Sequence, residues 1–224
     1  MKNLFGILQR GREWLESEAI PRPRRDPPAS QALGTASQVV ILLLDSSGSM
    51  GLPDYPPTRL EGGKQAIRGY LDKLEDNEPD TFVGIVAFGS TAKVLCRPVQ
   101  IRENGSEIRD ALRKDCPEGS TNTGDGLLVA SRLIKDIALR NSRIILLTDG
   151  YCTDEPNPVT VAGDLKSEGT QIDIIGIGGS PASVNEAELR TMASVVDGQI
   201  RYWFIRSKVE LVRKFEALAL REIQ

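Results

Sequence analysis

Histidine is absent from the 224-residue sequence, and this absence excludes several kinds of site. Without an imidazole the chain has no Ser-His-Asp triad, no Cys-His nucleophile and no histidine-ligated zinc. Cysteine is scarce as well: the chain has three, Cys96, Cys116 and Cys152, with no Cys-x-x-Cys pair. An odd number of widely spaced cysteines indicates neither a disulfide framework nor a zinc site. It is typical of a reducing compartment, so we expect a cytoplasmic protein.

An excess of charge of one sign is also lacking, since 28 Lys and Arg stand against 31 Asp and Glu, for a net charge of −3. A chain without a basic excess has little charge to neutralise phosphates, so we expect no nucleic-acid partner. The longest wholly apolar run, Val39–Leu44, is far shorter than the roughly 20 residues of a membrane-spanning helix. We therefore expect no integral membrane segment. The apolar patch at residues 4–8 is too short for a secretory signal.

The chain divides near residue 38. Residues 1–38 contain four prolines between Pro21 and Pro28, which predicts a short helix followed by an extended linker. Three interpretations of the short helix stay open: it docks on the domain, it binds a partner, or it anchors the chain at a membrane surface. The third is disfavoured by the acidic residues at positions 13, 16 and 18. Residues 39–224 have the size of one well-cored domain.

From residue 39 onward, short apolar runs alternate with segments of helical periodicity. Continuous β-branched runs are typical of strands buried on both faces, and the four runs are Val39–Leu44, Phe82–Phe88, Ile144–Leu147 and Ile172–Ile177. Apolar residues repeat at helical spacing over 66–74, 127–138, 189–196 and 212–219. Two further strands are expected at Thr91–Leu95, after a turn at Gly89-Ser90, and at Arg201–Ile205. The pattern predicts an α/β fold with a doubly wound, mostly parallel sheet, helices on both faces and one short antiparallel edge strand.

Oxygen-bearing side chains follow two of these strands. Asp45-Ser46-Ser47-Gly48-Ser49 comes directly after the first strand, Thr148-Asp149-Gly150 comes after the third, and a polar turn containing Thr121 opens a helix. Ligand sites of such sheets lie outside the carboxyl ends of the strands, so we expect these segments to meet. Carboxylate and hydroxyl oxygens suit a hard cation. We therefore expect Mg²⁺, with Mn²⁺ and Ca²⁺ as alternatives.

These segments resemble the von Willebrand factor type A (VWA) domain family over roughly residues 39–222. The family's metal-ion-dependent adhesion site (MIDAS) has the form Asp-x-Ser-x-Ser, then a distant Thr, then a distant Asp. The matching positions, in order, are Asp45, Ser47, Ser49, Thr121 and Asp149. Three matching segments at predicted strand ends or helix starts are far more specific than one serine-rich turn.

The resemblance implies roles for the five residues. Ser47 and Ser49 bind the metal directly, Thr121 joins them in the ligand-competent state, and Asp45 and Asp149 act through water or as anchors. An ion with so few direct carboxylates seeks an anionic oxygen from outside, so the resemblance implies docking of an Asp or Glu of a partner protein. It also implies a non-enzymatic module without a small-molecule substrate. Stand-alone domains of this kind resemble bacterial components of stress-response, phosphatase–kinase or metal-chelatase systems, and the sequence does not choose among these.

Other interpretations remain at this stage. Ser47 and Thr121 could act only as helix caps, and Cys116 and Cys152 could form a redox bridge, although free thiols are expected. A metal-dependent hydrolase or phosphatase is an alternative function, but an aspartyl nucleophile would want its acid at the position of Ser47, and the phosphate-binding glycine motifs are absent. A structural subunit with a vestigial metal site is a further alternative.

Overall fold

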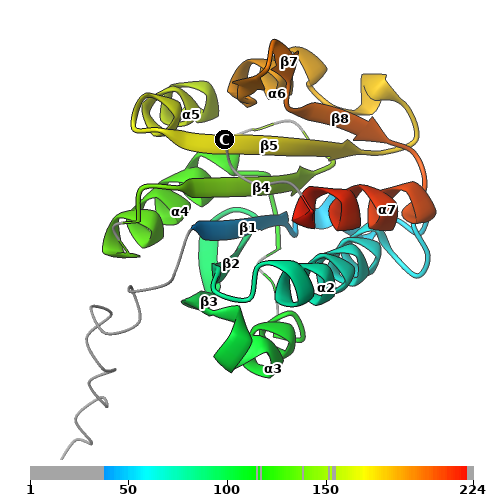
Figure 1. The fold of residues 1–224 in the computed structure, drawn as a ribbon. Coiled ribbons are helices and arrows are strands. Elements are labelled where there is room, and N and C mark those ends of the chain that lie inside the picture. The colour runs from blue at the N-terminus through cyan, green and yellow to red at the C-terminus, as the bar shows by residue number, and fades with distance from the viewer. Residues whose placement is uncertain are drawn as a thin grey trace, which may run out of the picture. The chain divides into compact units, whose positions relative to one another are not determined.

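The computed structural model describes residues 38–220, apart from positions 115, 117, 138, 151, 153 and 154. The helix and linker predicted for residues 1–38 therefore lie outside the described residues, except for Gln38. The main sheet contains β1 (Val39–Asp45), β2 (Phe82–Phe88), β3 (Ala92–Gln100), β4 (Ser142–Thr148), β5 (Thr170–Ile177) and β8 (Tyr202–Ile205). Its strand order is β3-β2-β1-β4-β5-β8, and every pair is parallel except β2 with β3 (Figure 1). The predicted fold class is confirmed.

Helices cover both faces of this sheet. The helices are α2 (Arg59–Asn77), α3 (Ile101–Ala111), α4 (Thr123–Ile137), α5 (Pro158–Ser167), α6 (Glu186–Met192) and α7 (Lys208–Ala219). On one face α2 and α7 lie side by side, with α3 beside α2, while α4 and α5 pack together on the other face (Figure 1). None of the described helices is both long and apolar enough to cross a bilayer.

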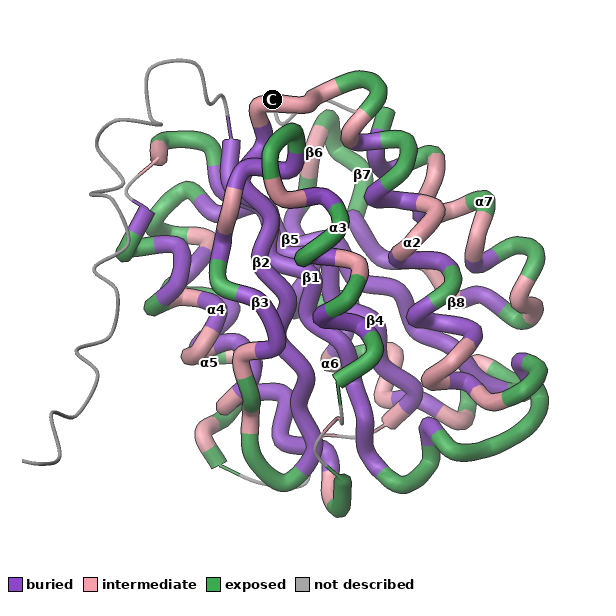
Figure 2. The backbone as a smooth tube through the Cα atoms, turned by 90° about the horizontal axis from the view of Figure 1, so that it is seen from below, coloured by how far each residue is buried: buried purple, intermediate pink, exposed green. Residues whose placement is uncertain are grey.

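The core explains why the central strands are apolar without interruption. All seven residues of β1, of β2 and of β4 are buried, as the purple strands of Figure 2 show. Successive side chains of a strand point to opposite faces, so each of these strands must supply apolar groups to both helix layers. In β1, Leu44 faces α2 near Gly63, and Leu43 faces α4 near Gly126. A continuous apolar run is therefore required.

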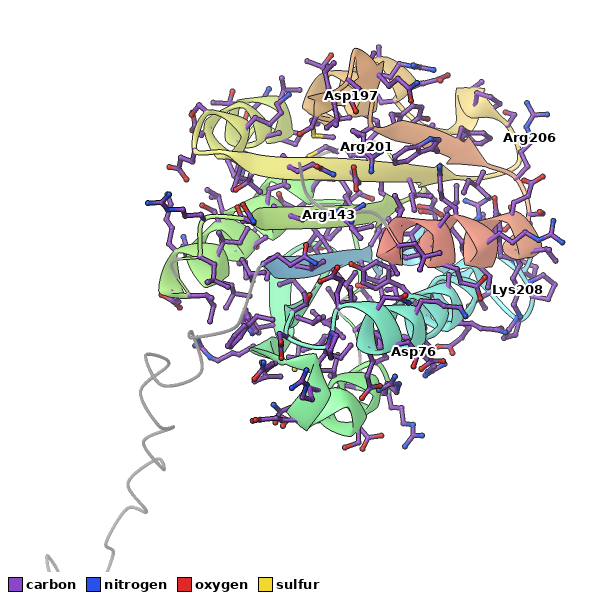
Figure 3. The ribbon with its side chains drawn as sticks, viewed as in Figure 1. Asp76, Arg143, Asp197, Arg201, Arg206 and Lys208 are labelled. Carbon is purple, nitrogen blue, oxygen red and sulfur yellow. The ribbon has the colours of Figure 1, made fainter. Side chains whose placement is uncertain are left out.

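A buried ionic cluster interrupts this core at β4 and β5. The fully buried carboxylate of Asp173 accepts hydrogen bonds from Arg143 and Arg201, with Nε to carboxylate oxygen distances of 2.7 Å in both cases. Arg143 also donates to the backbone oxygen of Leu218 at the end of α7 (2.9 Å). Figure 3 labels Arg143 and Arg201, which approach Asp173 of β5 from the two neighbouring strand positions, β4 and the residue before β8. The cluster thus joins two strands, the approach to β8 and the last turn of α7.

Several boundaries differ from the predictions, two of them for a clear physical reason. The edge strand β3 runs to Gln100 rather than ending at Leu95, because an edge strand tolerates Arg97 and Pro98, which break the apolar pattern. The helix predicted to reach Val196 ends at Met192, and Val195–Val196 instead forms β6, which pairs with β7 (Gln199–Ile200). The intervening Asp197-Gly198 has positive φ at both residues, as a tight hairpin turn requires.

Two helices were not predicted. Helix α3 has only three apolar side chains, Ile101, Ile108 and Ala111, and although they lie on one helical face, so short a set was not recognised as a helix. Helix α5 begins at Pro158, which is favourable at a first helical position, and Asn157 caps it by accepting hydrogen bonds from the backbone N–H groups of Val159 and Thr160.

The strand order reverses next to β1. The chain passes from β1 to β2 and β3 on one side, and then returns to place β4 and β5 on the other side. The carboxyl ends of β1 and β4 are adjacent at this reversal, which is where ligands bind in open α/β sheets.

Candidate metal centre

The candidate site begins at the last residue of β1. Asp45 ends the strand, and Ser46 then turns the chain, since both its backbone N–H (2.8 Å) and its hydroxyl (2.9 Å) donate to the backbone oxygen of Phe88. A short 3-10 helix, η2 (Gly48–Gly51), follows at once. Ser46 is thus structural, whereas Ser47 and Ser49 lie on the turn that it produces.

The carboxylate of Asp45 is completely buried and held at both oxygens. Its Oδ1 accepts from the backbone N–H of Ser47 (2.8 Å), and its Oδ2 accepts from the hydroxyl of Thr148 (2.6 Å). Burial raises the pKa of Asp45 from 3.8 to about 6, against the opposing effect of these hydrogen bonds. A buried carboxylate with a raised pKa is poised to gain from a nearby cation.

A chain of hydrogen-bonded oxygens begins beside this carboxylate, at Ser47. The hydroxyls of Ser47 and Ser49 are 3.3 Å apart, and the Ser49 hydroxyl donates to Oδ1 of Asp149 (2.7 Å). Asp149 is buried, whereas Ser49 is exposed. The site therefore opens to solvent at Ser49. Ser47 occupies the cap position of η2 without a capping hydrogen bond from its side chain, so capping does not explain this serine.

Thr121 lies on a loop packed against the same turn. The backbone N–H of Gly48 donates to the backbone oxygen of Gly119 (3.1 Å), and a Cβ built on Gly150 would lie 3.0 Å from Oγ1 of Thr121. The hydroxyl of Thr121 therefore faces the turn that carries Asp149. Thr121 is buried but does not cap α4, because Asn122 does so by accepting from the backbone N–H of Asp125 (3.0 Å).

The structure thus brings the five predicted residues to one edge of the sheet, three of them within a single chain of hydrogen-bonded oxygens. No group of three or more His, Cys, Asp and Glu side chains suited to a metal occurs among the residues described. A metal here would depend on hydroxyl oxygens together with carboxylates. That donor set fits a small hard cation such as Mg²⁺ and does not fit a softer ion that prefers nitrogen or sulfur.

Two residues of the site were not predicted, Thr148 and Arg59. Thr148 holds Asp45 as described. Arg59, the first residue of α2, has a side chain only 8% exposed and donates from Nη1 to Oδ2 of Asp149 (2.7 Å). A cation in the first turn of a helix is unfavourable, because it faces the positive end of the helix dipole. The position of Arg59 was therefore the one sequence feature that could have indicated a buried acidic partner for it.

None of the three cysteines, all within the described residues, is joined in a disulfide. Cys96 is buried, and burial raises its pKa to about 11, which suppresses the reactive thiolate at neutral pH. The redox bridge considered for Cys116 and Cys152 is not present.

The raised pKa of Asp45 gives a testable pH dependence. An acid whose pKa is higher in the folded state contributes stability that is fully present below its unfolded pKa and is lost as pH rises through its folded pKa. A rise from 3.8 to about 6 corresponds to about 3 kcal/mol. We expect the stability of the metal-free wild type relative to Asp45→Asn to fall by about 2.4 kcal/mol between pH 4 and pH 7.5 in urea unfolding experiments, because the first part of the loss occurs below pH 4. A difference that is constant with pH would contradict it.

Comparison with known proteins agrees with the fold described above. A family model described as the von Willebrand factor type A domain matches residues 40–151. A curated mycobacterial relative (Mycobacterium sp. strain KMS, "UPF0353 protein") is 28% identical over 204 residues, which cover 80% of this chain and 58% of that protein. The chain spans about half the length of the curated mycobacterial relatives that it matches.

Solved structures show the same fold. A von Willebrand factor type A protein from Catenulispora acidiphila superposes with a TM-score of 0.68 at 24% identity, covering 82% of this chain and 42% of that one. The proximal thread matrix protein 1 of the mussel byssus gives a TM-score of 0.65 at 22% identity, covering 82% and 46%. The structure of that byssus protein is described as having a zinc-occupied MIDAS motif.

Proposed function

Because the chain belongs to the von Willebrand factor type A family, whose domains generally bind protein partners, we propose that its polar site binds one Mg²⁺ and docks an acidic residue of a partner protein through that ion. One observation carries the proposal. The hydroxyls of Ser47 and Ser49 and the carboxylate of Asp149 form a continuous set of oxygens, and its central member, Ser49, is exposed. A fixed, open oxygen set is suited to an ion that keeps a coordination position free.

The residues of the chain have separate tasks in this function. Ser47 and Ser49 would bind the ion directly, with Thr121 completing the set, while Asp45 and Asp149 supply negative charge from buried, hydrogen-bonded positions. The bound ion would supply Lewis acidity towards an external carboxylate. Few direct carboxylate ligands leave that acidity only partly neutralised, so an incoming Asp or Glu is attracted rather than repelled.

The geometry does not favour the enzymatic alternative. Asp45, which stands where a phosphatase would place its nucleophile, has no exposed surface, and both of its oxygens accept hydrogen bonds. Ser47 occupies the position that an acid catalyst would need. We therefore propose a binding module, in a cytoplasmic protein as the odd number of widely spaced cysteines suggests.

Metal binding is tested by thermal unfolding. A ligand that binds only the folded state stabilises it by about 2.7 kcal/mol at a hundredfold excess over Kd. Mg²⁺ should therefore raise the midpoint of unfolding of the wild type. The increase should be absent in Asp45→Ala and Ser47→Ala, because these variants lose oxygens of the site.

Ser46→Ala is the matched control. Its hydroxyl donates to the backbone oxygen of Phe88, its one partner within the described part of the chain, so this variant loses a neighbouring serine without losing a site oxygen. Ser46→Ala should be less stable but should respond to Mg²⁺ as the wild type does. Equal responses of Ser46→Ala and Ser47→Ala would refute the metal site.

A further inference from the structure

Arg59 connects the candidate site to an exposed loop. One side of its guanidinium donates to the buried carboxylate of Asp149 (2.7 Å). The other side donates to both oxygens of Asp54, from Nε (2.7 Å) and from Nη2 (2.6 Å). The side chain of Asp54 is 38% exposed, so one arginine bridges a buried and a solvent-exposed carboxylate.

This bridge changes the charge that a bound ion would experience. Asp45 and Asp149 would together neutralise the two charges of Mg²⁺, which would remove its attraction for an external carboxylate. Arg59 offsets the charge of Asp149, while Ser49 continues to hold the other oxygen of Asp149. The hydrogen bonds to Arg59 also lower the pKa of Asp54, so both partners are charged at neutral pH.

We propose that Arg59 is a positioning residue that lowers the affinity of the site for Mg²⁺ and raises the affinity of the loaded site for a carboxylate. This inference rests on the proposed function and deepens it, because it names Arg59 as the group that sets the charge balance of the metal site. Asp54 acts in the opposite direction, because it competes with Asp149 for the charge of the same guanidinium. The placement of Arg59 at the unfavourable end of the helix dipole is consistent with a role in the site.

The test uses two substitutions with opposite expected effects. Arg59→Gln removes the charge but keeps an amide that can donate to Asp149. This variant should bind Mg²⁺ roughly tenfold more tightly, because a positive charge near a divalent ion costs affinity. In Asp54→Asn the charge of the Arg59 guanidinium is no longer shared with Asp54, so it offsets the charge of Asp149 more fully. This variant should bind Mg²⁺ severalfold more weakly. Isothermal titration calorimetry with Mg²⁺ alone measures both constants, and Asp54→Asn, at an exposed position, tests the proposal even where Arg59→Gln folds poorly.

Carboxylate binding is measured with acetate as the probe. Acetate is titrated into Mg²⁺-saturated protein at constant ionic strength while the backbone amide signals of Gly48 and Ser49 are followed by NMR. Arg59→Gln should bind acetate severalfold more weakly than the wild type, and Asp54→Asn should bind it more tightly. A purely structural role for Arg59 would weaken both ligands together, so shifts of opposite sign distinguish the two.

Arg109→Gln is the control for loss of a bridging arginine. Arg109 also joins two carboxylates, Asp72 and Glu75, but these lie 13 or more residues along α2 from Arg59, about 20 Å away. This variant should leave both constants unchanged. If the wild type binds Mg²⁺ and both Arg59→Gln and Asp54→Asn bind it with the same Kd as the wild type, the role of Arg59 is overturned while the proposed function stands. Absence of Mg²⁺ binding by the wild type would overturn the proposed function, and this inference with it.

Discussion

Asp173→Asn is expected to lower the free energy of unfolding by about 3–5 kcal/mol, because it leaves two buried guanidiniums without the carboxylate that they share. Arg143 donates to this carboxylate from β4, and Arg201 donates from the residue before β8. Nε2 of Gln171 also donates to the carboxylate of Asp173 (3.1 Å). The NH₂ group of an asparagine at this position would therefore face donors from three side chains and could accept from none of them. For a domain of this size the loss corresponds to a decrease of roughly 6–20 °C in the unfolding midpoint.

Asp136→Asn is the control for this prediction. Asp136 pairs with Arg97 at 3.6 Å, and both side chains are well exposed, so the loss should be at most about 1 kcal/mol. Chemical unfolding followed by circular dichroism measures both differences. A loss for Asp173→Asn as small as that for Asp136→Asn would show that the buried cluster does not stabilise the fold.

The same substitution should spare the metal site. Arg143 is the second residue of β4 and Asp149 follows the last, so the ionic cluster and the candidate site lie at opposite ends of one strand. At a temperature where Asp173→Asn is folded, its Kd for Mg²⁺ should equal that of the wild type. Stability and metal binding are thereby separable in this domain.

The interior of the sheet could be predicted from the sequence because burial on both faces leaves few choices. The apolar run Phe82–Phe88 was predicted as a strand, and β2 spans those residues. The edge strand β3 was predicted less well. An edge strand can expose polar side chains to solvent, and Pro98, which has no N–H to donate, is tolerated there, so the apolar pattern is interrupted. Prediction was therefore most reliable where the physical constraint is tightest.

The same distinction holds within the candidate site. The oxygens of Asp45, Ser47 and Asp149 were placed together because strand ends in a parallel sheet share an edge. Arg59 was missed because its unfavourable place in the first turn of a helix does not identify its partner: Asp149 lies 90 positions further along the chain, and no local pattern links the two. A short-range pattern identifies groups that a strand or helix presents, whereas a side chain that reaches across the site is visible only in three dimensions.

Loss of the metal is expected to abolish partner binding. A carboxylate that docks on a bound Mg²⁺ replaces a water in a partly desolvated interface, where removing one member of a charged pair costs about 2–5 kcal/mol. This corresponds to a weakening of Kd of roughly 30- to 4,000-fold. Without the ion, the same carboxylate would face the negative charges of Asp45 and Asp149, so attraction becomes repulsion.

Affinity capture with three baits measures this dependence. Proteins retained by the wild type and by Ser46→Ala in Mg²⁺ should be released by EDTA, and Ser47→Ala should not retain them. One Asp or Glu of the captured partner should then dominate an alanine scan of its surface. Its replacement by Asn or Gln keeps the shape, removes the charge and should weaken binding nearly as much as chelation does. A partner whose affinity survives both EDTA and every such acidic-to-amide change would bind elsewhere on the domain, since no contact through the ion tolerates the loss of either charge.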